Sequence, residues 1–399
     1  GLFLLGFSAY VVLGTAGHTL APRDYAAVAS LYLLVAITSP GVFTALEQEV
    51  NREVSSRRAA GVGTGAVTRG GLIVGAGYAG SVAVVLLAAA PWLVPRVLGG
   101  HWSLLAAAIV ATVGAAAVYL LRGLFAGERR FGWYAASLGM EGTARLVPCA
   151  VLALVGATDP LAYGWAFALG TGIAALACLP GRTVSTPAPS AGNPVEVRAM
   201  ARATGLLVVA SGLTYVVANT APLVLTARLT AAPEVAASFV SLFVLARIPV
   251  FLFGPVQAFL LPTLTAGAER ADLGHLRSRL RVALLAVAAV GVPGALLTAA
   301  LGPWAARTLF GAPLDLSHAA AGLLGAGTVA MLAAQVLQPA LVALRAHRMA
   351  TTAWVIGVLA FAAMLAAPVD PTTAAIAAQV VGPSTVCAVM GVAIGTRLR

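Results

Sequence analysis

The sequence contains no lysine, because all 24 of its basic residues are arginine. A nucleotide-binding P-loop needs a lysine that reaches the phosphates, and Schiff-base catalysis needs a lysine amine. The chain therefore has neither kind of site, and any ATP-driven step would require a partner.

Charge of either sign is scarce. Only 9% of the 399 residues are charged and 60% are hydrophobic, whereas soluble domains carry about 25% charged residues. A surface this poor in charge must be covered largely by lipid. The net charge of +11 does not indicate a nucleic-acid partner, because the arginines occupy short loops between apolar stretches and form no single basic face.

Residues that usually carry catalysis or metal binding are few and scattered. Cys149, Cys178 and Cys387 lie apart within apolar segments and lack metal-ligand or disulfide-framework spacing. The five histidines lie near the ends of apolar stretches, and no Ser-His-Asp grouping appears. We therefore expect no catalytic residues, no metal site, no cofactor and no enzymatic activity.

Long apolar stretches dominate the chain. Because a membrane-spanning helix needs about 20 apolar residues, the sequence predicts an all-α integral membrane protein with about 12 spans. Residues 3–20 lack a signal-peptide cleavage site and form the first span. The predicted spans are 3–20, 25–45, 71–94, 102–121, 132–155, 161–179, 203–226, 235–258, 281–301, 317–343, 350–367 and 372–395.

The arginines are unequally divided between the two sets of loops. One set holds Arg52, Arg57, Arg58, Arg69, Arg122, Arg129, Arg130, Arg182, Arg198, Arg202, Arg270, Arg277, Arg279, Arg281, Arg345, Arg348, Arg397 and Arg399. The other set holds Arg23, Arg96, Arg228 and Arg307. Basic loops stay in the cytoplasm, so we expect a protein of the cytoplasmic membrane with both termini inside.

The chain contains an internal repeat. The segment 91–99 (PWLVPRVLG) matches 303–311 (PWAARTLFG), and 30–34 (SLYLL) matches 241–245 (SLFVL), both displaced by about 211 residues. An even number of spans per copy gives a parallel repeat, whose halves can rock about an axis along the membrane normal. We predict one six-helix bundle over 1–180, a cytoplasmic linker over 181–202, and a second bundle over 203–399.

Charged side chains inside the spans are the first candidates for a site. A charge at a helix centre costs about 2.5–3.5 kcal/mol on insertion scales, so it should face protein or water. Glu141 and Arg145 can pair along one helix, and they share a face with Tyr134 and Ser137. Either this pair only joins helices, or Arg145 contacts substrate.

Arg247 lies within a span of the other half. Two arginines at mid-depth would suit an anionic headgroup, because guanidinium groups grip phosphate oxygens in pairs. The alternative for Arg247 is a bond to backbone carbonyls that the nearby Pro249 leaves free.

Uncharged polar side chains add further candidates for substrate contact. Ser211, Tyr215 and Asn219 form a stripe on the seventh span, and Gln335 and Gln338 lie close together on the tenth. Hydrogen bonds between helices explain such residues equally well.

Two parallel six-helix halves without an ATP site resemble the multidrug/oligosaccharidyl-lipid/polysaccharide exporter superfamily. Residues 45–52 (ALEQEVNR) and 122–131 (RGLFAGERRF) look like segments of actinobacterial polysaccharide flippases. The resemblance implies a MATE-like, V-shaped pair of bundles around a central cavity. It also implies flipping of a polyprenyl-diphosphate-linked oligosaccharide, with Arg145 and Arg247 at the diphosphate and the polar stripes at the sugars.

Two other functions stay open. A MATE-type drug or cation antiporter has the same architecture, but its drug-exporting members commonly carry an acidic residue in the first span, which Leu2–Leu20 lacks. A membrane glycosyltransferase or polymerase would need catalytic carboxylates or a large extramembrane loop, and neither is evident. Expected partners are the lipid-linked substrate, membrane lipids, and polysaccharide glycosyltransferases or a polymerase.

Overall fold

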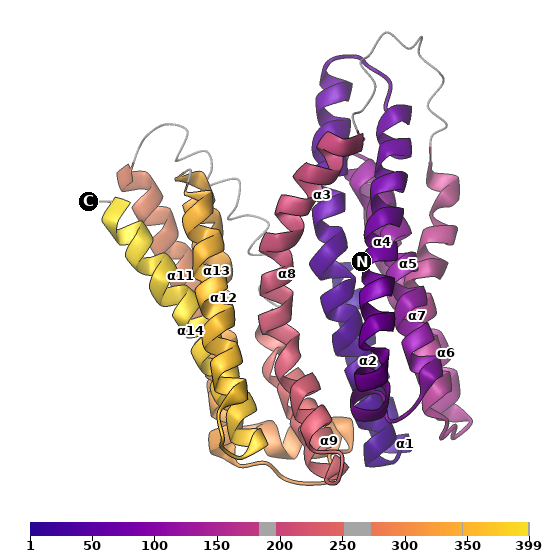
Figure 1. The fold of residues 1–399 in the computed structure, drawn as a ribbon, viewed down its shortest axis with the longest axis vertical. Helices are drawn as coiled ribbons and strands as arrows, with labels where there is room; N and C mark the ends of the chain where they lie inside the picture. The colour runs from indigo at the N-terminus through magenta and orange to yellow at the C-terminus, as the bar shows by residue number, and fades with distance from the viewer. Residues whose placement is uncertain (183–196, 251–272, 345, 398–399) are drawn as a thin grey trace. The chain divides into compact units, whose positions relative to one another are not determined.

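The computed structural model describes residues 1–182, 197–250, 273–344 and 346–397 (Figure 1). Within these ranges every regular element is a helix. The chain divides into two compact units, Gly1–Asn219 and Thr220–Arg399. This boundary lies inside a helix, and residues 197–202 of the predicted linker are helical, so the division at 181–202 remains a prediction.

The described part of the first unit contains seven complete α-helices, one short 3-10 helix and most of an eighth α-helix. They are α1 (Leu2–Thr19), α2 (Pro22–Thr38), α3 (Pro40–Ala59), α4 (Gly65–Val97), α5 (Trp102–Gly127), α6 (Phe131–Leu154), α7 (Pro160–Ala177), the short η1 (Leu179–Gly181) and α8 (Val197–Arg228). The helices described in the second unit are α9 (Pro233–Ala246), α11 (Leu273–Phe310), α12 (His318–Ala343), α13 (His347–Ala366) and α14 (Pro371–Arg397).

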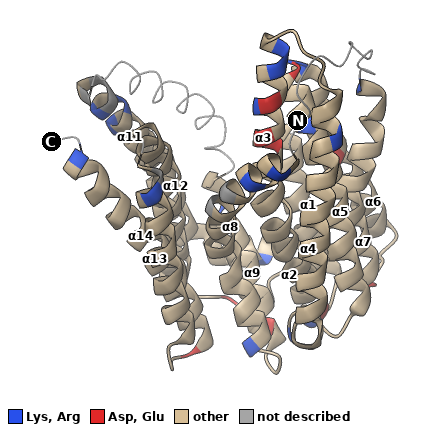
Figure 2. Cartoon of the chain, turned by 45° about the horizontal axis from the view of Figure 1, so that its top comes forward, with Lys and Arg blue, Asp and Glu red and all other residues tan. Residues whose placement is uncertain are grey.

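The helices have the length and composition of membrane spans. Among the described residues, eleven segments are long and apolar enough to cross a membrane, with α2 and α3 counted as one. α6, the remaining predicted span, has 24 residues but carries more polar side chains. Large apolar side chains face outward, such as Leu154 (87% exposed) and Leu359 (64%). Charged residues are almost confined to the helix ends (Figure 2). The prediction of an all-α integral membrane protein is confirmed.

The second predicted span is broken at Ser39. α2 ends at Thr38 and α3 begins at Pro40, because proline has no backbone N–H to continue the helical ladder. α3 then extends to Ala59 through the charged stretch 46–58, where Glu53 and Arg57 pair at 3.0 Å.

Helix ends repeat between the two units. The segments 91–99 and 303–311 terminate α4 and α11, and their last residues, Gly99 and Gly311, adopt φ of 64° and 61°, which glycine tolerates without a Cβ penalty. The starts of α7 and α14 repeat as well. Asp159 precedes Pro160 and accepts the N–H of Leu161 at 2.9 Å, and Asp370 precedes Pro371 and accepts the N–H of Thr373 at 3.0 Å.

The central helices of the two units also correspond. α5 packs against α4 and α7, and α12 packs against α11 and α14. Both helices have 26 residues. Thr112 of α5 bonds to the carbonyl of Ala108 at 2.8 Å, and Thr328 of α12 bonds to that of Leu324 at 3.1 Å. These matches, 216 residues apart, fix the register in which α5 can be compared with α12.

The segments 45–52 and 122–131 form one joint between α3 and α5. A Cβ placed on Gly123 would lie 2.8 Å from the carbonyl oxygen of Glu47, and one on Gly127 would lie 2.6 Å from Cβ of Val54. Glycines four residues apart allow this close helix approach in membranes. Arg58 donates to the carbonyl of Glu128 at the same joint. The joint holds α3 beside the start of α6.

Candidate functional site

The polar stripe of α6 faces the interior of the first unit. Ser137, Glu141 and Arg145 are 0%, 4% and 7% exposed, and Tyr134 is half-buried. Their 3-4-4 spacing places them on one face of the helix. This face packs toward the other helices of the unit, as the cost of charge in lipid requires.

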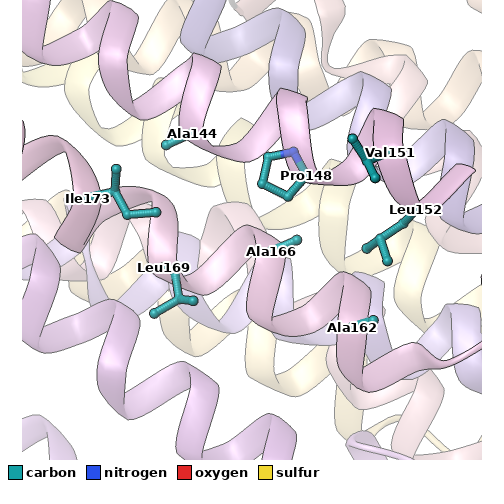
Figure 3. A pocket seen from close by; sticks show the side chains of 8 residues that line it. All are labelled: Ala144, Pro148, Val151, Leu152, Ala162, Ala166, Leu169 and Ile173. Atoms are coloured by element: carbon teal, nitrogen blue, oxygen red, sulfur yellow. The ribbon is translucent and has the colours of Figure 1, made fainter.

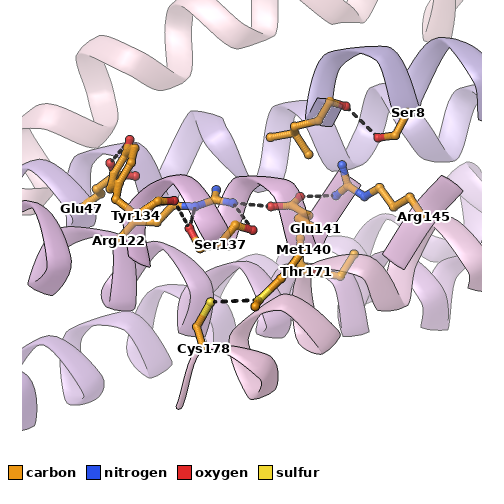
Figure 4. Close-up of polar contacts among 12 residues, drawn as sticks. Ser8, Glu47, Arg122, Tyr134, Ser137, Met140, Glu141, Arg145, Thr171 and Cys178 are labelled. Atoms are coloured by element: carbon orange, nitrogen blue, oxygen red, sulfur yellow. Dashed lines mark hydrogen bonds and ion pairs between the residues drawn. The ribbon is translucent and has the colours of Figure 1, made fainter. Parts of the chain in front are cut away.

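Glu141 bridges two guanidinium groups. Its Oε1 lies 2.6 Å from a terminal nitrogen of Arg145, and its Oε2 lies 2.6 Å from a terminal nitrogen of Arg122. Figure 4 shows the three side chains in a row, with the carboxylate in the middle. The formal charge of this triad is +1.

The placement of Arg122 in a cytoplasmic loop was wrong. α5 continues to Gly127, so Arg122 lies on the helix and is only 2% exposed. Its Nε donates to Oγ of Ser137 at 3.1 Å, and its guanidinium lies 5.1 Å from the ring of Tyr119. The signal in the sequence was the apolar run Leu124-Phe125-Ala126 beyond the arginine, which shows that the span does not end at residue 121.

The triad extends along α6 to α3. Ser137 donates to the carbonyl of Tyr134 at 2.7 Å, and the hydroxyl of Tyr134 donates to Glu47 of α3 at 2.8 Å. A continuous series of hydrogen bonds and ion pairs therefore runs from Glu47 to Arg145 (Figure 4). Such a series links the α3–α5 joint to the triad.

Arg145 packs against α7. Its guanidinium is 4.3 Å from the ring centre of Phe167, and a Cβ on Gly170 would come within 2.5 Å of its Cγ. Its Nε is buried without a hydrogen-bond partner. An unpaired buried donor is costly, and it marks a position where a water molecule or a ligand oxygen would be stabilised.

The second unit has no equivalent of this triad in its described part. In the register of Thr112 and Thr328, the counterpart of Arg122 is Gln338, which accepts the indole N–H of Trp354 at 2.9 Å. α6 and α13 begin in the same register, at Phe131 and His347.

α13 carries no charge at the positions of the α6 pair. The counterparts of Glu141 and Arg145 are Gly357 and Phe361, and Phe361 packs against Gly382 of α14. The same packing frame is therefore built in the second unit without buried charges.

The other predicted site residues lie on helices outside the triad. Arg247 caps the C-terminus of α9, half-buried, with its guanidinium 5.0 Å from the ring of Phe243. It belongs to the second unit, whereas Arg145 belongs to the first. Gln335 and Gln338 lie on α12 and are also half-buried. Arg122 and Arg145 meet at one buried carboxylate of the first unit, that of Glu141.

The polar stripe of α8 contacts the first turn of α3. Ser211 donates to the carbonyl of Gly41 at 2.9 Å, and a Cβ placed on Gly41 would lie 3.2 Å from Cβ of Tyr215. Asn219 is 6% exposed and donates to the carbonyl of Tyr215 at 2.9 Å. Ser211 thus makes a hydrogen bond between helices, and contact of Tyr215 or Asn219 with substrate remains a prediction.

An apolar groove of about 400 Å³ lies between α6 and α7 (Figure 3). Figure 3 shows its lining, which is Ala144, Pro148, Val151, Leu152, Ala162, Ala166, Leu169 and Ile173. These side chains offer hydrocarbon only. The groove therefore does not provide a headgroup site, and in the part of the chain that the structure describes no cluster of His, Cys, Asp or Glu could hold a metal ion.

The chain matches no established protein-family profile. Two curated Mycobacterium tuberculosis proteins are similar to it, Uncharacterized protein Rv1510 of strain H37Rv and Uncharacterized protein MT1558/MT1560 of strain CDC 1551. Each is 25% identical over 390 residues, which cover 97% of this chain and 88% of the relative.

Solved structures of membrane transporters share the fold. An inward-facing multidrug resistance MATE family transporter of the MOP superfamily has a TM-score of 0.76 at 13% identity, covering 100% of this chain and 94% of the other. The lipid II flippase MurJ has a TM-score of 0.65 at 11% identity, covering 98% of this chain and 86% of the other. The fold of the chain is that of MATE transporters and MurJ.

Proposed function

We propose that this protein is a transporter that flips a lipid with an anionic diphosphate headgroup, such as a polyprenyl-diphosphate-linked oligosaccharide, across the cytoplasmic membrane. The observation that carries the proposal is the buried triad of Arg122, Glu141 and Arg145, with two guanidinium groups for one carboxylate. The fold shared with MATE transporters and with the lipid II flippase MurJ supports a transport function.

The chemistry of the triad favours an anion over a cation as cargo. Two guanidinium groups on either side of one anion present N–H donors in the geometry that phosphate oxygens accept. A drug-cation antiporter would be served by an excess of carboxylates, and α1 contains none. Arg145 is the arginine of the triad with an unused buried donor.

Orientation in the membrane is also a proposal. With Arg122 reassigned to the interior of α5, the remaining arginines are still strongly biased toward one set of loops. This bias supports cytoplasmic termini. Sugar-transferring enzymes and a polymerase acting on the same lipid are the proposed partners.

A flipping assay tests the proposal. Full-length protein is reconstituted in liposomes containing a fluorescent polyprenyl-diphosphate sugar, and the fraction that an external quencher cannot reach is followed with time. We expect exchange between leaflets well above that of protein-free liposomes and no movement of a cationic dye. Movement of the dye alone would instead identify a cation exporter.

Arg247 is tested by a second comparison. If Arg145 and Arg247 both contact the diphosphate during transport, replacing both with alanine should abolish the surface polysaccharide that the wild-type gene restores in a deletion strain. Full restoration by the double variant would eliminate the contribution of this pair and leave that of Arg122 to be tested separately.

A further inference from the structure

We propose that Glu141 is an internal substitute for the substrate anion: its carboxylate fills a site for a diphosphate or similar dianion formed by Arg122 and Arg145, and substrate binding displaces it. This inference rests on the proposed function and concerns how the same site is emptied and filled. The ligand class is a diphosphate, carried by a lipid or free in water.

The geometry of the carboxylate is the first step. Glu141 gives one oxygen to each guanidinium, at 2.6 Å in both cases, so it bridges the two arginines as a phosphate group would. Arg122 is fixed independently by Ser137, through its Nε at 3.1 Å. One arginine is thus held in place even when the carboxylate leaves.

The second step is the unused hydrogen-bonding capacity. Arg145 keeps a buried Nε without an acceptor, because Glu141 lies on the same helix and meets only the terminal nitrogen. A carboxylate has two oxygens and a diphosphate has more, so a diphosphate can satisfy donors that Glu141 leaves unpaired. The site is therefore better matched to the larger anion than to its internal one.

The third step is the comparison between the units. The second unit packs the corresponding positions with Gln338, Gly357 and Phe361 and without any ion pair there. The fold therefore does not require the triad for helix packing. Buried ion pairs in general contribute little net stability relative to apolar packing, which leaves binding as the reason for three buried charges.

The test measures affinity for two probes. Purified full-length protein in nanodiscs is titrated with farnesyl diphosphate, a lipid diphosphate, and separately with inorganic pyrophosphate. Glu141→Gln removes the competing charge and keeps the side-chain shape, so binding should tighten by about tenfold, the effect expected for one hydrogen bond to a charged group. Tightening for farnesyl diphosphate alone would mean that the lipid is the ligand, and tightening for both would mean that the diphosphate suffices.

The controls separate this idea from a general charge effect. Glu49→Gln removes another buried carboxylate (5% exposed) that pairs with Arg52 at 2.6 Å, and it should leave both affinities unchanged. Adding Arg122→Gln to Glu141→Gln should remove the gain.

Unchanged or weaker binding by Glu141→Gln would overturn the inference, as would equal gains from Glu141→Gln and Glu49→Gln. If Glu141→Gln does not fold, Glu141→Asp takes its place. Its shorter carboxylate reaches one guanidinium only, so it should also bind more tightly than wild type, and unchanged binding would again overturn the idea. Flipping by wild type with no affinity gain in either variant would refute the inference and leave the proposed function standing.

Discussion

Glu141 holds two arginines from different helices, Arg145 on its own helix α6 and Arg122 on α5. Its pairing with Arg145 followed from the four-residue spacing within one helix, and the structure contains that ion pair. Its second partner, Arg122, lies 19 positions earlier on another helix, and no local pattern links the two. The span containing Arg122 was predicted to end at residue 121, because an arginine normally marks the end of a membrane helix.

Gly170 is the residue on which the position of Arg145 depends. In Gly170→Ala the new methyl group would lie 2.5 Å from Cγ and 2.9 Å from Nε of Arg145, so the side chain would have to leave the face of α7. Overpacking of this kind costs about 1–3 kcal/mol. We expect a lower thermal unfolding midpoint of the detergent-purified protein and slower lipid flipping.

Gly172 provides the matched control for Gly170. It lies on the same helix, and a Cβ there would meet nothing within 4 Å. Gly172→Ala should therefore be neutral or should stabilise the protein by about 0.5–1 kcal/mol, because alanine loses less backbone entropy in a helix. Equal effects of the two substitutions would show that Gly170 does not position Arg145.

At the scale of helices, the α3–α5 joint brings the separate sequence segments 45–52 and 122–131 into contact. The glycines of α5 lie against the backbone and branched side chains of α3. A Cβ placed on Gly127 would lie 3.0 Å from the carbonyl oxygen of Asn51. Tyr134 then connects this joint to Glu47. A change at the joint should therefore disturb both helix packing and the polar series that leads to the triad.

Gly127→Ala tests the joint. The added methyl group would lie 2.6 Å from Cβ and Cγ1 of Val54, and neither atom is a flexible end that can move aside. We predict destabilisation by about 1–3 kcal/mol, measured as a lower unfolding midpoint. Gly139→Ala on α6, where a Cβ meets nothing within 4 Å, should not lower it, and a loss of stability there equal to that at Gly127 would contradict this explanation.

The sequence predicted where helices cross the membrane better than where they end. Apolar runs located the spans, because hydropathy reports which residues tolerate lipid. α4 and α11 extend well past the predicted spans, to Gly65–Val97 and Leu273–Phe310, because a helix can continue into water, where hydropathy no longer decides. The division of the second span into α2 and α3 at Ser39 needed the structure.

At the scale of the whole molecule, the two units repeat the same helix starts but differ in their buried charges. Pro22 and Pro233 begin α2 and α9, and Pro160 and Pro371 begin α7 and α14, each pair 211 residues apart. The repeat was visible in sequence because helix ends demand particular residues. The inequality was not visible, because it depends on which interior positions face each other.

The uncharged positions of the second unit are a natural template for replacing the triad. The variant Arg122→Gln, Glu141→Ala, Arg145→Phe gives the first unit the uncharged kind of packing seen around Gln338 and Phe361. Since no charge remains unpaired, we expect the variant to keep most of its stability. The unfolding midpoint, compared with that of Glu141→Ala alone, checks this, because the single variant leaves the buried guanidinium groups of Arg122 and Arg145 without a carboxylate. A triple variant less stable than the single one would contradict the repeat-based argument.

The most direct test of the central claim is the flipping rate of this triple variant in liposomes containing a fluorescent polyprenyl-diphosphate sugar. If the buried arginines of the first unit handle the diphosphate, the folded variant should flip the lipid at least about tenfold more slowly than wild type, the loss expected from one charge-assisted contact. A folded triple variant that flips the lipid at the wild-type rate would contradict the claim.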